Sequence, residues 1–147
     1  MRLKNDWTMS MGRIHLLILM FSVGACLVVT AGCGNKRVAQ VRGKVIFKNG
    51  SMPKAGIRMI RLEPAADTSA TIRKGASGSI NDDGTFDIYT RRPGDGVYLG
   101  TYAVTFTFLK SFTEQQQMIA KKYTVAATTP YHLTVKKNAD DLEYELE

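Results

Sequence analysis

The chain has 147 residues and carries 20 Lys and Arg against 13 Asp and Glu, a formal net charge of +7. A hydrophobic fraction of 44% and a charged fraction of 22% are ordinary for a globular domain, which excludes a disordered tail and a multispan membrane protein. Two cysteines and two histidines are too few for a disulfide scaffold or a Cys/His zinc module.

Residues 1–32 have the pattern of a secretory signal peptide, and we expect a signal helix there. Arg2, Lys4 and Arg13 precede an apolar run over 14–32 that ends in small residues. The alternative is an uncleaved anchor, because a run of this length could just span a hydrocarbon core of about 30 Å. Both interpretations place the remainder of the chain outside the cytoplasm.

The end of this run resembles the bacterial lipoprotein signal. Ala31 and Gly32 precede Cys33 as that signal requires, whereas Thr30 stands where leucine is usual. The resemblance implies cleavage after Gly32, acylation of Cys33 and a short tether over 33–39. The expected location is the cell envelope, with the domain held on the membrane through acylated Cys33. Gly34 after the cysteine favours the outer membrane over the inner one.

Alternation of apolar and polar residues dominates the rest of the chain and predicts strands with one buried face. The clearest case is 101–109, where Tyr102, Val104, Phe106 and Phe108 point to one side. Strands are predicted near 41–47, 57–63, 77–80, 85–90, 101–109, 131–135 and 142–146. Seven short strands separated by turns predict an all-β, antiparallel seven-stranded β-sandwich over 40–147.

The connecting segments carry turn signals. Asn49-Gly50 and Asp83-Gly84 place glycine where hairpin turns need positive φ. The segment 64–75 is expected to be irregular. Only 113–122 has helix-forming composition, and we expect a short helix or a long loop there.

The ordered motifs of the domain resemble a known family. They are Val41-Arg42-Gly43-Lys44-Val45, Leu62-Glu63-Pro64, Asn81-Asp82-Asp83-Gly84-Thr85-Phe86, Arg92-Pro93-Gly94-Asp95-Gly96, Gly100-Thr101-Tyr102-Ala103-Val104-Thr105 and Thr129-Pro130-Tyr131-His132-Leu133. They are similar to small lipoproteins with a carboxypeptidase regulatory-like domain, numerous in planctomycete bacteria. The resemblance implies a transthyretin-like (prealbumin-like) Greek-key sandwich and provides no catalytic residue.

Few residues outside the signal suggest chemistry. His132 is the only histidine of the domain and is predicted on an outward face without a serine or carboxylate partner, so we expect no enzyme activity. Asp82, Asp83, Asp87 and Asp95 are expected to cap turns, with weak calcium binding as the alternative. No cofactor and no metal site are expected.

The expected function is that of a structural or interaction module that binds envelope proteins or anionic glycans. Basic doublets lie mostly in loops without interleaved aromatic residues, so nucleic acid is not an expected partner. The alternative is a small-molecule carrier, or an accessory domain of an envelope enzyme complex, with a pocket between Tyr102, Phe106, Tyr131 and Tyr144. Loops clustered at one end of a sandwich are the usual binding surface, which makes 91–100 and 112–122 the candidate interaction segments. The candidate residues are Arg91, Arg92, Asp95, Tyr98, Lys121 and Lys122.

Overall fold

The computed structural model of the chain describes residues 37–66 and 72–147. This part is all-β, as predicted, with one short 3-10 helix. In chain order its elements are β1 (Val38–Ala39), β2 (Val41–Phe47), β3 (Ile57–Pro64), β4 (Ala76–Ser79), β5 (Thr85–Ile88), β6 (Val97–Tyr98), β7 (Gly100–Leu109), the 3-10 helix η1 (Lys121–Tyr123), β8 (His132–Val135) and β9 (Ala139–Leu146).

A strand occupies each of the seven segments for which alternation predicted one. The described part has nine strands rather than seven, because the two-residue strands β1 and β6 pair with each other. For 113–122 we expected either a short helix or a long loop. The structure has a long loop there, with a single 3-10 turn at its end. Two residues are too short a window for alternation to reveal, which is why β1 and β6 escaped the sequence analysis.

The strands form two main sheets. The larger has the order β4-β3-β7-β8, with antiparallel neighbours throughout. The smaller has the order β5-β2-β9, in which β2 runs antiparallel to β5 and parallel to β9. The prediction of a purely antiparallel sandwich is therefore wrong for β2 and β9. Alternation records which face of a strand is buried and carries no information about the direction of its neighbour.

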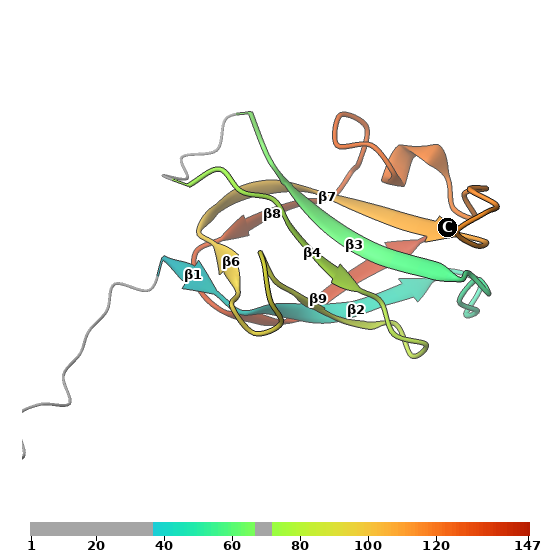
Figure 1. The fold of residues 1–147 in the computed structure, drawn as a ribbon, viewed down its shortest axis with the longest axis horizontal. Coiled ribbons are helices and arrows are strands. Elements are labelled where there is room, and N and C mark those ends of the chain that lie inside the picture. The colour runs from blue at the N-terminus through green and yellow to red at the C-terminus, as the bar shows by residue number, and fades with distance from the viewer. Residues whose placement is uncertain (1–36, 67–71) are drawn as a thin grey trace, which may run out of the picture. The chain divides into compact units, whose positions relative to one another are not determined.

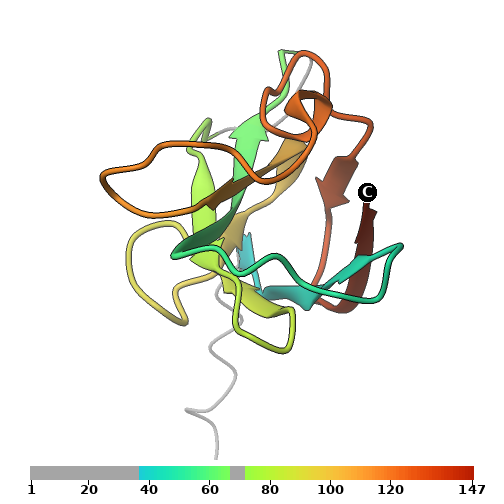
Figure 2. The same ribbon diagram turned by 90° about the vertical axis from the view of Figure 1, so that its right-hand side faces the viewer.

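The two sheets face each other across one core, in a sandwich-like arrangement. Figure 1 shows β3 and β7 in one layer and β2 and β9 in the other, and Figure 2 gives the same layers from the side. The ring of Phe108 in β7 meets that of Phe47 in β2 edge-on, with centroids 5.4 Å apart. Phe106 meets Tyr144 of β9 at 5.5 Å. The apolar face predicted for 101–109 thus joins the two sheets.

The opposite face of β7 is more buried than alternation suggested. Ala103 and Thr105, predicted to point to the polar side, are only 5% and 4% exposed. β7 is a central strand between β3 and β8, and the Thr105 hydroxyl donates to the carboxylate of Glu63 in β3 at 3.4 Å. Side chains of both neighbouring strands therefore limit solvent access to this face.

The glycine turns have the predicted conformation but not always the predicted partner strands. Gly84, at φ +87°, closes the turn between β4 and β5, where Asp83 accepts hydrogen bonds from the Thr85 backbone N–H at 2.9 Å and hydroxyl at 2.7 Å. β4 and β5 belong to different sheets and are joined beside this turn by the isolated bridge between Ile80 and Phe86. Gly50 has φ +72°, and the strands on either side of it, β2 and β3, also belong to different sheets. The predicted hairpin at Asn49-Gly50 is therefore a connection between the layers.

Candidate functional site

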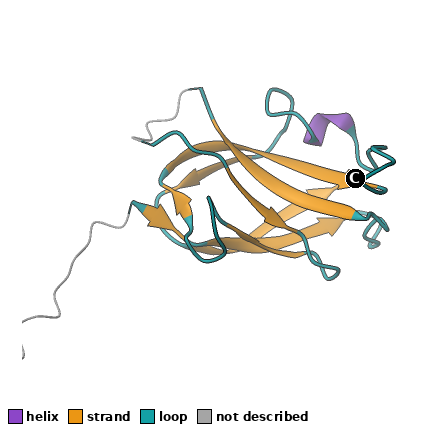
Figure 3. Cartoon of the chain, in the orientation of Figure 1, coloured by secondary structure: helices purple, strands orange, loops and turns teal. Residues whose placement is uncertain are grey.

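The two loop segments predicted to bind partners, 91–100 and 112–122, lie at opposite ends of the described domain and not at one end as expected. The first leads into the start of β7 at Gly100, and the second follows the end of β7 at Leu109. Because β7 has ten residues that rise about 3.3 Å each, the segments are about 30 Å apart. Figure 1 places β6 at the left, and Figure 3 places η1, in purple, at the right. The predicted residues thus form two surfaces, here named the β1 end and the η1 end.

One carboxylate organises the loop at the β1 end. Asp95 accepts hydrogen bonds from the backbone N–H groups of Thr90 and Arg91, both at 2.9 Å, and of Arg92 at 3.1 Å. Desolvation opposes ionisation of this carboxyl, but the amide donors outweigh it and lower the pKa of Asp95. Gly94, at φ +87°, lets the chain turn around the carboxylate. Asp95 is therefore a turn cap, as predicted.

A glutamine ties this loop to the turn between β8 and β9. The side-chain amide of Gln40 donates to the Gly94 carbonyl at 3.0 Å. The backbone N–H of Gln40 donates to the side-chain oxygen of Asn138 at 3.1 Å. The Leu99 N–H donates to the Arg37 carbonyl at 3.1 Å. Three distant chain segments therefore meet at the β1 end.

Tyr98 has a structural place at the same end. It lies half-buried in β6, and its carbonyl accepts a hydrogen bond of 2.7 Å from the Tyr102 hydroxyl. Burial raises the pKa of the Tyr102 phenol, so this hydroxyl stays a donor. Among the predicted residues here, Arg91, Arg92 and Asp95 are brought into one turn, and Tyr98 lies in the short strand that follows it.

The loop at the η1 end is a compact turn that displays an aromatic side chain. Its base is held by the Met118 N–H, which donates to the Phe108 carbonyl at 2.8 Å. Its tip is closed by the Glu114 N–H, which donates to the Ser111 hydroxyl at 2.9 Å, and by an ion pair of 2.7 Å between Lys110 and Glu114. Phe112, inside this turn, is 84% exposed. A turn closed by hydrogen bonds and an ion pair therefore presents a phenyl ring to solvent.

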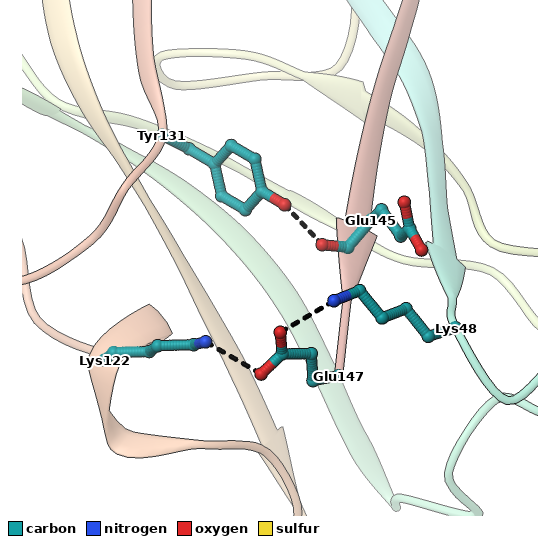
Figure 4. Close-up of polar contacts among 5 residues, drawn as sticks. All are labelled: Lys48, Lys122, Tyr131, Glu145 and Glu147. Carbon is teal, nitrogen blue, oxygen red and sulfur yellow. Dashed lines mark hydrogen bonds and ion pairs between the residues drawn. The ribbon is translucent and has the colours of Figure 1, made fainter.

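The two predicted lysines of η1 differ in their surroundings. Lys121 is exposed, whereas the Lys122 ammonium lies 2.8 Å from the Glu147 carboxylate, which also binds Lys48 at 2.8 Å (Figure 4). Hydrogen bonds from Lys122 and Lys48 lower the pKa of Glu147 to about 2. The Tyr131 hydroxyl donates to the carbonyl of Glu145 beside this cluster. The cluster links η1, β2 and β9.

The aromatic residues considered for a pocket fill the interior instead. Tyr131 and Tyr144 have ring centroids 5.1 Å apart, and Phe106 meets Tyr131 at 6.0 Å. Tyr102 and Phe106 are at most 1% exposed. Burial is also the main cause that raises the pKa of Tyr144 to about 12. Phe106, Tyr131 and Tyr144 pack against one another, and Tyr102 is fully buried. The pocket that a carrier would need between these four residues is therefore filled by their own side chains.

The other candidates for chemistry take part in local structure. His132 is exposed on β8 and lines a pocket with Pro64, Thr101 and several alanines. Asp82 pairs with Arg58 at 2.5 Å. Asp87 lies 3.5 Å from Arg42. In residues 37–66 and 72–147, no group of three or more His, Cys, Asp or Glu side chains is arranged to hold a metal ion.

The residues of the predicted lipoprotein signal lie outside the described part of the chain. They are the signal peptide 1–32 with its helix, the cleavage residues Thr30, Ala31 and Gly32, the acylation site Cys33 and the tether up to residue 36. In the part that is described, no helix has the length and apolar character needed to cross a bilayer.

Gln40 was not singled out by the sequence analysis, and Phe112 was named only as the first residue of the segment 112–122. Gln40 gave no signal, because its role depends on two loops that are remote in sequence. Phe112 did give a sequence signal, because it is an aromatic residue between Ser111 and Thr113 and stands outside any alternating stripe.

Comparison of the chain with protein-family models, curated proteins and solved structures gave no match.

Proposed function

We propose that this chain is a non-enzymatic, lipid-anchored domain of the cell envelope that binds another envelope protein through the turn around Phe112. The lipid anchor is acylated Cys33, and the sandwich is of the transthyretin-like, carboxypeptidase regulatory-like Greek-key type. The sheet orders β4-β3-β7-β8 and β5-β2-β9 support that type, because successive strands cross between the two layers.

The exposed ring of Phe112 is the observation that carries the binding role. An aromatic side chain that is 84% exposed leaves apolar surface in water, and enclosing it in a partner's pocket would remove that surface. The Ser111–Glu114 hydrogen bonds and the Lys110–Glu114 ion pair already hold the turn. Binding therefore costs little further ordering of the backbone.

The packing of the interior favours a surface role over that of a carrier. Tyr131 and Tyr144 contact each other at 5.1 Å, and Phe106 contacts Tyr144 at 5.5 Å. A ligand between these rings would have to separate them and open the core. Contact through the loops requires no such rearrangement.

The binding role is tested by site-specific crosslinking in intact cells. A photoreactive phenylalanine analogue at position 112 should form a discrete adduct with one envelope protein, whereas the same analogue at the exposed position Thr128 should not. The Phe112→Ser variant should lose co-purification of that protein. The control Val125→Ser, which removes a side chain that is 41% exposed, should retain it. Equal co-purification with both variants would overturn the assignment to Phe112.

The lipid anchor is tested separately on Cys33. The Cys33→Ala variant should lose the acyl mass of the mature protein and partition into the aqueous phase of a detergent extraction. An unchanged mass and unchanged partition would refute acylation at this position. This outcome would leave the crosslinking result at Phe112 untouched.

A further inference from the structure

Five basic residues at the β1 end have no ion-pair partner among the described residues, in contrast to three lysines near the η1 end. Arg37, Arg91, Arg92, Lys136 and Lys137 are all exposed, and none of them forms an ion pair with another described residue. Near the η1 end, Lys48, Lys110 and Lys122 each have a carboxylate within 2.8 Å. Within the described residues, five exposed cations without an ion-pair partner therefore lie together at the β1 end, while Lys54 and Lys121 are further such cations elsewhere on the domain.

The five cations form one surface because the segments that carry them are bound together. Gln40 links the loop that holds Arg91 and Arg92 to Asn138, which directly follows Lys136 and Lys137. Lys136 and Lys137 also line a pocket with Val38 and Leu99. The strand β1, which begins one residue after Arg37, therefore lies among these side chains.

The acidic residues nearby leave this surface positive. Asp95 directs its carboxylate to three backbone amides, and Asp140 lies 3.8 Å from Arg42. Asp141 is exposed at the start of β9. Arg42 also lies 3.5 Å from Asp87. Four carboxylates thus stand beside six cations, with Asp87 and Arg42 included.

The short sequence separation between Arg37 and Cys33 limits how far this surface can lie from the proposed lipid. Arg37 is four residues after Cys33, so the two are separated by at most about 14 Å of extended chain. If Cys33 carries the lipid, the β1 end cannot move farther than this from the headgroups. The Phe112 turn lies at the other end, about 30 Å away along β7.

We propose that the β1 end, formed by Arg37, Arg91, Arg92, Lys136 and Lys137, docks on anionic phospholipid headgroups and directs the Phe112 turn away from the membrane. This inference rests on the proposed lipid anchor at Cys33. An acyl anchor fixes the domain's distance from the bilayer but leaves it free to tilt. Each Lys or Arg close to an anionic surface favours the bound orientation by about fivefold, so five together select one tilt.

Lysine footprinting on the full-length protein in vesicles tests this orientation. The purified lipidated protein is reconstituted in vesicles of phosphatidylcholine alone or of phosphatidylcholine mixed equally with phosphatidylglycerol, and a water-soluble amine reagent is added. Mass spectrometry then gives the modification rate at each lysine. We expect Lys136 and Lys137 to react about fivefold more slowly on the anionic vesicles, and Lys121, at the η1 end, to react equally on both. Molar salt should abolish the difference.

Matched variants separate this surface from a general effect of charge. Arg91→Glu with Arg92→Glu reverses two charges of the β1 end and should remove the protection of Lys136 and Lys137. The turn itself should persist, because the backbone amides that bind Asp95 are retained. The control pair Lys44→Glu with Lys54→Glu changes charge equally at exposed positions outside the β1 end and should leave the protection in place. The reactivity of Lys122, whose ammonium is bound to Glu147 in the folded chain, reports whether each variant keeps its fold.

The two proposals fail in different ways in this experiment. Equal reactivity of Lys136 and Lys137 on both kinds of vesicle, with the protein floating with both, overturns the docking surface while the anchor stands. Loss of the protein from the neutral vesicles overturns the anchor. Protection that persists in the Arg91→Glu, Arg92→Glu variant at low salt also contradicts the assignment.

Discussion

The carboxylate of Glu147 lies 2.8 Å from the ammonium of Lys122, so the end of β9 is tied to the 3-10 helix that closes the exposed loop. The same carboxylate binds Lys48, at the end of β2, also at 2.8 Å. One side chain thus holds together the parallel strand pair of one sheet and the loop that leaves the other (Figure 4). Partners this far apart in the sequence meet only in the folded chain.

The Glu147 cluster predicts an acid-dependent loss of stability. The pKa of Glu147 is lowered to about 2 by its two lysine partners, whereas an unfolded glutamate titrates near its ordinary value of about 4.3. The cluster therefore stabilises the fold above pH of about 4.3, and its contribution is lost as the pH falls towards 2. Carboxyl NMR titration should find Glu147 ionised at pH of about 3, and the Lys48→Gln variant should raise its pKa.

The buried Tyr144 predicts a loss of stability in alkali. Burial raises its pKa to about 12, against about 10 in the unfolded chain, because the core disfavours the phenolate. Its contribution is complete below pH of about 10 and is lost as the pH rises to 12, a difference of about 2 to 3 kcal/mol. Urea unfolding of wild type and Tyr144→Phe over this range should give a shallower decline for the variant. Parallel declines would contradict the prediction.

Two phenylalanines of the β7 region should differ sharply in their effect on stability. Phe106 is 1% exposed between the sheets, so Phe106→Ala should lower the free energy of unfolding by about 3 to 5 kcal/mol. Phe112 is 84% exposed, so Phe112→Ala should change it by less than about 0.5 kcal/mol. Urea titration of both variants checks the contrast. A large loss for Phe112→Ala would mean that the ring supports the fold rather than a partner.

The cap at Asp95 predicts a local effect of mutation. Asp95→Ala removes the acceptor of three backbone amides, so hydrogen exchange at Thr90, Arg91 and Arg92 should become faster. Exchange in β7 should be unchanged, because this loop is exposed and contributes little to the core. The control Asp141→Ala, also exposed, should leave the loop amides as they are. Unchanged exchange in Asp95→Ala would show that Gly94 and Gln40 suffice to hold the turn.

Much of the fold was predictable because burial leaves a period of two in a strand. The segments 101–109 and 142–146 alternate without a break, and β7 and β9 cover them. Alternation failed for the outer face of β7, where Thr105 is covered by its neighbours, since polarity does not report how many strands flank a residue. The turn role of Asp83 and Asp95 followed from side-chain chemistry that acts within five residues.

The candidate surfaces were less predictable. Arg91 and Lys122 looked alike as members of basic doublets, yet one is unpaired among the described residues and the other is bound to Glu147. The difference depends on which strand ends beside them, which no local pattern contains. The separation of the two loops likewise follows from the length of β7 lying between them.

The sequence by itself determined the positions of seven strands, their inward faces and the capped turns, because these depend on side chains a few residues apart. Only the tertiary structure decided the parallel pairing of β2 with β9, where a Cβ on Gly43 would lie 2.1 Å from the Leu142 carbonyl oxygen. It alone decided that the five cations of the β1 end and the exposed Phe112 lie at opposite ends. Such relationships arise when hydrophobic burial brings remote segments together, and the chain records them in no single stretch.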